Sequence, residues 1–182
     1  MIFDKSWPRF AMESAIEHSI QESGLSGGRC TNIGCGPSGR YKELLSIFDV
    51  DGVDIVGPCS AQMAWRYHQV DAAKLPFPDE MFDFAIAIEW FEHIEANKEA
   101  MSECARVLKP VGVAVITVPT HWTWLFEFGR HGPHYYSHHT LSKLVVSSGL
   151  KIDMVSGCGG VVLYIANLVK SWSSPIGIRI FR

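Results

Sequence analysis

Apolar and polar residues recur along the chain with spacings that predict helices and strands in alternation. Ile16 and Ile20 lie four residues apart in a stretch from about Phe10 to Ser23, which predicts an amphipathic helix ended by Gly24. Residues 82–88, FDFAIAI, are apolar at nearly every position, as in a strand covered on both faces. The chain therefore carries both helix and buried-strand patterns.

The clearest helix pattern lies in the middle of the chain and is closed by Pro110. Its apolar stripe consists of Ala100, Met101, Cys104, Ala105 and Leu108. Ser137 is placed to cap a later helix, which Gly149 ends. The other predicted elements are strands at 29–33, 52–57, 113–118, 151–156 and 176–180, a helical segment at 40–48 and a short helix at 61–67.

This alternation of strands and helices predicts the α/β class. Right-handed crossovers between successive strands give a mostly parallel, doubly wound sheet with helices on both faces. The 182 residues suit a single domain, and no repeat or linker divides them. Only sixteen residues separate Asp54 from Asp71, so the second crossover helix is expected to be short.

Composition and net charge argue against some classes of function. A hydrophobic share of 47% and a charged share of 19% are typical of a folded globular protein. The net charge of -3 and the lack of a Lys/Arg-rich run give no electrostatic case for a nucleic-acid partner. Five scattered cysteines form no Cys-x-x-Cys pair, which favours a reducing compartment. With no signal peptide and no transmembrane segment, a cytoplasmic location is expected.

Three glycines, Gly34, Gly36 and Gly39, lie close together after the first predicted strand. Such a turn lies at the carboxyl edge of a parallel sheet, where ligands bind. The spacing G-x-G-x-x-G also fits the dinucleotide fingerprint, so the loop alone leaves the nucleotide-like ligand open. Asp54 follows Gly34 by twenty residues, where a carboxylate can accept hydrogen bonds from ribose hydroxyls.

Five motifs occur in series between about Cys30 and Ile152: NIGCGPSG, GVDI, DAAKLPFPDEMFD, EWFEHI and RVLKPVG. In this order and spacing the chain resembles the Rossmann-like S-adenosylmethionine-dependent methyltransferases. Within them it is most similar to the small-molecule branch that includes the ubiquinone and menaquinone biosynthesis enzymes. The resemblance implies a Rossmann-like fold, S-adenosylmethionine as cofactor and methyl transfer to a small molecule.

The resemblance also implies the residues of the cofactor site. The glycines would lie against the methionine part, Asp54 would hold the ribose hydroxyls, and Asp71 would reach the adenine amine. Ile88 and Glu89, at the end of the fourth strand, would line the pocket near the sulfonium. The predicted cofactor-binding residues are Asn32, Ile33, Gly34, Cys35, Gly36, Gly39, Asp54, Asp71, Ala72, Ile88 and Glu89.

The chain departs from the family pattern at two positions. Asn32 stands where an Asp or Glu is common, and Val111 in KPVG stands at a turn that usually prefers glycine. These departures keep open a catalytically degenerate cofactor-binding or scaffolding subunit on the same fold. A nucleic-acid or protein methyltransferase and an NAD-linked dehydrogenase are weaker alternatives, because neither a basic patch nor further dehydrogenase features accompany the glycine loop.

Methyl transfer from a sulfonium needs mainly positioning, and a base only where the acceptor must lose a proton. Glu92 and His93 follow the fourth strand and His121 the fifth, so His93 and His121 are the candidate bases. An aromatic segment after the fifth strand would form walls for a planar, apolar, cationic or lipid-like acceptor. The predicted acceptor-binding residues are Trp90, Trp122, Trp124, His134 and Tyr135.

Two further expectations concern metals and the end of the chain. His134 and His138 have the spacing of a helical metal pair, but the Ser137 cap places His134 outside the helix, so no metal site is predicted. Residues 157–182 are atypical of the family, with an apolar stretch at 161–169. This segment is interpreted as a core helix, a homodimer face or a membrane-surface contact.

Overall fold

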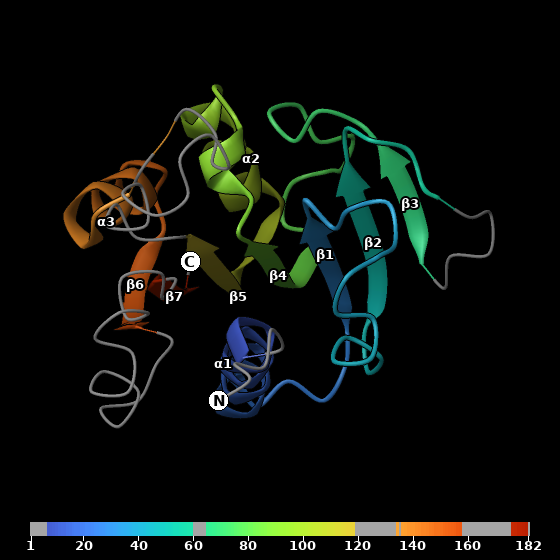
Figure 1. Cartoon of the computed structure of the whole chain (residues 1–182), viewed down its shortest axis with the longest axis horizontal. Helices are drawn as coiled ribbons and strands as arrows, with labels where there is room; N and C mark the ends of the chain where they lie inside the picture. Colours follow the sequence, from blue (N-terminus) through green and yellow to red (C-terminus); the bar gives the residue numbers. More distant parts are fainter. Residues whose placement is uncertain (1–6, 60–64, 119–133, 135, 158–175, 182) are drawn as a thin grey trace, which may run out of the picture.

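The computed structural model describes residues 7–59, 65–118, 134, 136–157 and 176–181 (Figure 1). Seven strands form one sheet in the order β3-β2-β1-β4-β5-β7-β6. In chain order the elements are α1 (Trp7–Ser23), β1 (Arg29–Ile33), β2 (Asp49–Asp54), β3 (Arg66–Gln69), β4 (Phe82–Ile88), the 3-10 turn η1 (Phe91–His93), α2 (Asn97–Val107), β5 (Leu108–Val118), α3 (His138–Ser147), β6 (Lys151–Gly157) and β7 (Ile176–Phe181).

The sheet is mostly parallel, as predicted. Strands β3, β2, β1, β4 and β5 run parallel to one another. Strand β7 is antiparallel to both β5 and β6 and lies between them. The carboxyl ends of β1, β2 and β4 therefore meet at one edge, which positions the glycine loop, Asp54 and Glu89 near one another.

Helices cover both faces of the sheet, and the alternation of side chains along β5 shows this directly. Val113 and Val115 pack in the same core cluster as Ile16 of α1. Ala114 and Ile116, which point to the opposite face, pack in the cluster that contains residues of α2 and α3. In Figure 1, α1 lies on one side of the sheet and α2 on the other.

The half of the sheet formed by β1, β2 and β3 buries a charge cluster. The Asp51 side chain of β2 is only 1% exposed. It accepts hydrogen bonds from Arg29 Nη2 at 2.7 Å, Arg66 Nε at 2.9 Å and His68 Nε2 at 2.8 Å. Burial by itself raises the pKa of this carboxyl, but the bonds from Arg66, His68 and Arg29 bring it down to about 2.

The predicted helix at 40–48 is wrong, because these residues form a series of turns that ends before β2. Tyr41 adopts a left-handed φ of 65°, which breaks a right-handed helix at its second residue. The Arg40 carbonyl, which would accept a bond in the first helical turn, accepts one from Asn32 Nδ2 at 2.8 Å. The predicted helix at 61–67 is wrong at its end, where Arg66 and Tyr67 lie in β3, while 61–64 lie outside the described residues.

The helix predicted to end at Pro110 is shorter than expected. α2 ends at Val107, and Leu108 and Pro110 belong to β5. Val111 also lies in this strand and is 86% exposed, so the expected turn at Val111 is absent. This position therefore does not require glycine. The predicted strand at 52–57 both begins and ends three residues earlier than expected, at Asp49 and Asp54.

The remaining predicted elements are confirmed with small shifts of their bounds. α1 begins three residues earlier than expected and is followed by Gly24 at φ +67°. Ser137 caps α3 through a reciprocal pair of bonds with Thr140, and Gly149 follows the helix at φ +87°. Within the described residues, no helix has the length and apolar character needed to cross a membrane.

Candidate functional site

The glycine loop joins β1 to the turns before β2 and has a backbone that few other residues could adopt. Gly34, Gly36 and Gly39 have φ values of +69°, +68° and +64°, all in the left-handed region. The N–H groups of Gly34 and Cys35 both donate to the Val53 carbonyl, at 2.8 and 3.2 Å. The loop is thus folded back over the end of β2.

Asp54 holds this loop in place. One carboxylate oxygen accepts from the Gly36 N–H at 2.8 Å, and the other accepts from the Val56 N–H at 2.9 Å. A carboxylate has about four acceptor positions, so these bonds leave capacity for further donors such as hydroxyls. Asp54 therefore both shapes the glycine loop and presents a negative charge beside it.

Asn32 has a structural role that an Asp or Glu could not fill. Its side chain is 2% exposed, and its Nδ2 donates to the carbonyl of Arg40, at the far end of the glycine loop. An ionised carboxylate has no proton to donate and would face that carbonyl as a buried charge. The departure from the family pattern at Asn32 thus fastens the loop to β1.

The remaining residues predicted at this edge follow the neighbouring strands. Asp71 follows β3, and its carboxylate accepts from the Ala73 N–H at 2.9 Å, while Ala72 is buried. Ile88 ends β4 and is 3% exposed, packing in the α1-side core. Glu89 has a left-handed φ of 47°, and its N–H donates to the Thr117 carbonyl at 2.9 Å.

The comparisons with known proteins agree with this geometry. Residues 31–116 match the family of methyltransferase domains.

The chain is similar to several methyltransferases of other organisms. It is 35% identical over 89 residues to a probable S-adenosylmethionine-dependent methyltransferase of Mycolicibacterium smegmatis, covering 46% of this chain and 34% of that protein. It is 32% identical over 126 residues to the probable tRNA methyltransferase 9B of Homo sapiens, covering 63% of this chain and 25% of that protein. The chain thus spans about a third of the length of the first relative and a quarter of the second.

Solved structures share the fold at low sequence identity. An S-adenosylmethionine-dependent methyltransferase of Mesorhizobium loti superposes with a TM-score of 0.73 at 18% identity, covering 94% of this chain and 98% of that one. The Rossmann-like fold expected from the sequence is therefore confirmed. The narrower similarity to the quinone-biosynthesis branch stays a prediction.

Trp90 lies against the glycine loop, a contact that the sequence did not predict. A Cβ atom placed on Gly34 would lie 2.0 Å from Cδ1 of the Trp90 indole, so the ring lies directly against the glycine. The ring also makes an edge contact with Phe91, with centroids 5.2 Å apart. Trp90 was predicted to contact the acceptor, and the structure places it beside the first glycine of the predicted cofactor loop.

Glu92 is buried while its neighbour His93 is exposed. The Glu92 side chain is 1% exposed, and its Oε2 has no hydrogen-bond partner in the part of the chain that the structure describes. Burial, with a smaller contribution from Glu89, raises the pKa of this carboxyl to about 8. The His93 side chain is 47% exposed, with Nε2 3.6 Å from Glu92 Oε1. Of the two residues, Glu92 has the more unusual environment, because its side chain is buried. The sequence showed only that it follows the fourth strand.

The other predicted acceptor and catalytic residues divide into two groups. His134 is described and lies before α3, where its N–H donates to the Glu92 carbonyl at 3.3 Å. No cluster of three or more metal-ligating side chains occurs in the described ranges. The residues that lie outside the described ranges are His121, Trp122, Trp124 and Tyr135, together with the apolar stretch at 161–169.

Proposed function

We propose that this chain is an S-adenosylmethionine-dependent methyltransferase that acts on a small-molecule acceptor. The observation that carries the proposal is the loop of three left-handed glycines tied to Asp54 at the carboxyl edge of a parallel sheet. Glycine permits this left-handed backbone, and the carboxylate beside it suits ribose hydroxyls. Asp71 follows the neighbouring strand, where it suits the adenine amine.

Relatives of the same fold support the cofactor but leave the acceptor open. A 1,6-didemethyltoxoflavin-N1-methyltransferase of Burkholderia thailandensis and the N-methyltransferase NodS of Bradyrhizobium japonicum are both described with S-adenosylhomocysteine. Among the curated relatives are probable tRNA methyltransferases and a sterol 24-C-methyltransferase. The net charge of -3 favours a small molecule over nucleic acid. The homodimer and the cytoplasmic location stay predictions.

When bound, S-adenosylmethionine supplies an electrophilic methyl group. The residues of the chain then bind and orient the cofactor and the acceptor, and hold or transfer protons. The glycine loop and Asp54 position the ligand, and the Glu89 region at the end of β4 faces the same edge. With a pKa of about 8, Glu92 holds a proton at neutral pH and gives it up only under mildly alkaline conditions. His93 and His121 stay candidate bases for an acceptor that must lose a proton.

The test is calorimetric titration of the chain with S-adenosylmethionine and S-adenosylhomocysteine, beside Asp54→Asn and the control Asp49→Asn. Asp49 lies at the opposite end of β2 and contacts Arg66, far along the strand from the loop. We expect wild-type binding in the micromolar range, weakened about tenfold or more by Asp54→Asn through loss of a charged acceptor. The control should bind like wild type.

Absence of binding by a folded wild-type chain would overturn the proposal. Binding without transfer of a labelled methyl group to small-molecule extracts would instead support the degenerate, scaffolding alternative. Circular dichroism of each variant separates loss of binding from loss of fold.

A further inference from the structure

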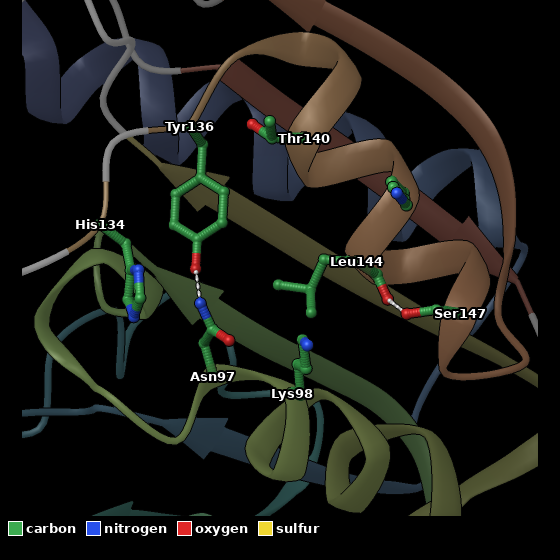
Figure 2. A pocket seen from close by; sticks show the side chains of 8 residues that line it. Asn97, Lys98, His134, Tyr136, Thr140, Leu144 and Ser147 are labelled. Carbon is green, nitrogen blue, oxygen red and sulfur yellow. Dashed lines mark hydrogen bonds between the residues drawn. The ribbon is translucent and has the colours of Figure 1, made fainter.

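A cavity of about 570 Å³ lies between the start of α2 and the length of α3 (Figure 2). The two helices follow β4 and β5, so both begin at the carboxyl edge of the sheet, the edge that carries the glycine loop. Among the described lining residues, His134 is a predicted acceptor residue and none is a predicted cofactor residue. The volume falls within the range of small-molecule sites in proteins.

The charges around this cavity are of one sign. Lys98 of α2 and Lys143 of α3 both line it, and neither forms an ion pair with a carboxylate among the described residues. None of the described lining residues is acidic. The cavity therefore favours an anion over a cation.

The start of α2 adds to this preference. Ala96 precedes the helix and offers no side-chain cap, so the first N–H groups of α2 lack the partner that Ser137 provides for α3. Uncapped N–H groups and the helix dipole attract negative charge at this point. Asn97 and Lys98, the first two residues of α2, line the cavity.

The walls provide both apolar surface and polar positions. Leu144 and the Tyr136 ring supply hydrocarbon, and Asn97 Nδ2 donates to the Tyr136 hydroxyl at 2.8 Å across the gap between the helices (Figure 2). The Nε2 atom of His134 is enclosed and has no hydrogen-bond partner among the described residues. An enclosed polar atom without a partner costs free energy that a ligand can recover by pairing with it.

We propose that this cavity binds a small molecule with an anionic group, a carboxylate or a phosphate, attached to an apolar body. The anionic group lies between Lys98 and Lys143 at the start of α2, and the apolar body lies against Leu144 and Tyr136. That this molecule is the methyl acceptor rests on the proposed function, whereas the binding itself does not.

The test is calorimetry with four eight-carbon probes: octyl phosphate, octanoate, octanol and octylammonium. The proteins are wild type, the double variant Lys98→Gln/Lys143→Gln, and the control Lys151→Gln, an exposed lysine of β6. We expect the two anions to bind wild type and the control at least about tenfold more tightly than octanol, because each charge-assisted bond contributes measurably. The double variant should lose this preference. Both lysines are exposed, so the fold should be retained.

Equal binding of octanol and the anions, tighter binding of octylammonium, or an unchanged double variant would overturn the inference. A difference between octyl phosphate and octanoate identifies which anionic group the site prefers. Each titration is repeated with S-adenosylhomocysteine. Cofactor binding without anion binding refutes the cavity site alone, and anion binding without cofactor binding refutes the methyltransferase proposal alone.

Discussion

Two carboxyl groups are buried, one within the sheet and one just beyond β4, and they differ in their hydrogen-bond partners. Asp51, in the half formed by β1 to β3, receives hydrogen bonds from two arginines and a histidine and has a pKa of about 2. Glu92, beyond β4, is equally buried but has an oxygen without a partner in the described residues, and its pKa is about 8. Both are about 1% exposed.

The difference shows that hydrogen-bond partners, more than depth of burial, set the protonation state of a buried carboxyl group. Three donors keep Asp51 ionised and join β1, β2 and β3 where the described crossovers contain no helix. Glu92 has no arginine or lysine partner among the described residues, only His93 Nε2 at 3.6 Å from one of its oxygens, and it stays protonated at neutral pH. The first acid ties three strands together, and the second keeps its proton at neutral pH.

Removal of the Asp51 carboxylate should have the largest effect on stability. Asp51→Ala removes three charge-assisted hydrogen bonds to a buried carboxylate, from Arg29, Arg66 and His68, which should cost about 4 kcal/mol at roughly 1.5 kcal/mol for each bond. Because folding lowers the pKa of Asp51, its contribution is present above about pH 4 and is lost as the pH falls towards 2. Urea unfolding at pH 7 and pH 2.5 measures both effects, and a loss that is the same at both pH values would contradict the ionic role. Asp49→Ala, at an exposed partner of Arg66, should cost far less.

A cavity in the helix-covered half should cost slightly less and should not depend on pH. Leu141 of α3 is fully buried among apolar side chains, so Leu141→Ala is expected to lower the free energy of unfolding by about 3 kcal/mol. Val146→Ala, on the exposed side of the same helix, serves as the control. A loss of stability in Leu141→Ala that depends on pH would contradict this difference between the two halves of the sheet.

Neutralising Glu92 should have an effect of the opposite sign, because it should stabilise the folded chain. The carboxyl stays protonated in the folded chain up to about pH 8 but ionises near pH 4.5 when unfolded. Wild-type stability should therefore fall as the pH rises from about 4.5 to 8, and Glu92→Gln should remove that fall, gaining little at pH 4.5, about 2 kcal/mol at pH 6 and more at pH 8. Urea unfolding across this range, with the exposed Glu95→Gln as control, measures it. Equal pH profiles for wild type and Glu92→Gln would contradict the raised pKa.

The elements that the sequence predicted well are those whose own residues determine them. Phe82–Ile88 is apolar at every position except Asp83 and is buried on both faces, and Ser137 caps α3 through a local bond. The positions of Gly34, Gly36 and Gly39 predicted a special backbone, which their left-handed φ values confirm.

The elements that were missed depend on distant partners. Residues 66–69 are polar and match no strand pattern, yet they form β3 because Arg66 and His68 reach Asp51 on the neighbouring strand. The helical spacing at 40–48 is overridden by Tyr41 and by the Asn32 bond to Arg40. Glu92 could be noted from its place after β4, but its burial is a property of the assembled fold.

The antiparallel strand β7 has a consequence for the order in which the sheet can assemble. β6 precedes β7 in the chain, yet it is the last strand of the sheet and pairs with β7, which in turn pairs with β5. Until β7 inserts, both β5 and β6 present open hydrogen-bonding edges. Such edges can pair with another chain. Synthesis of this protein at high concentration therefore carries a risk of misassembly in the interval before β7 pairs with both strands.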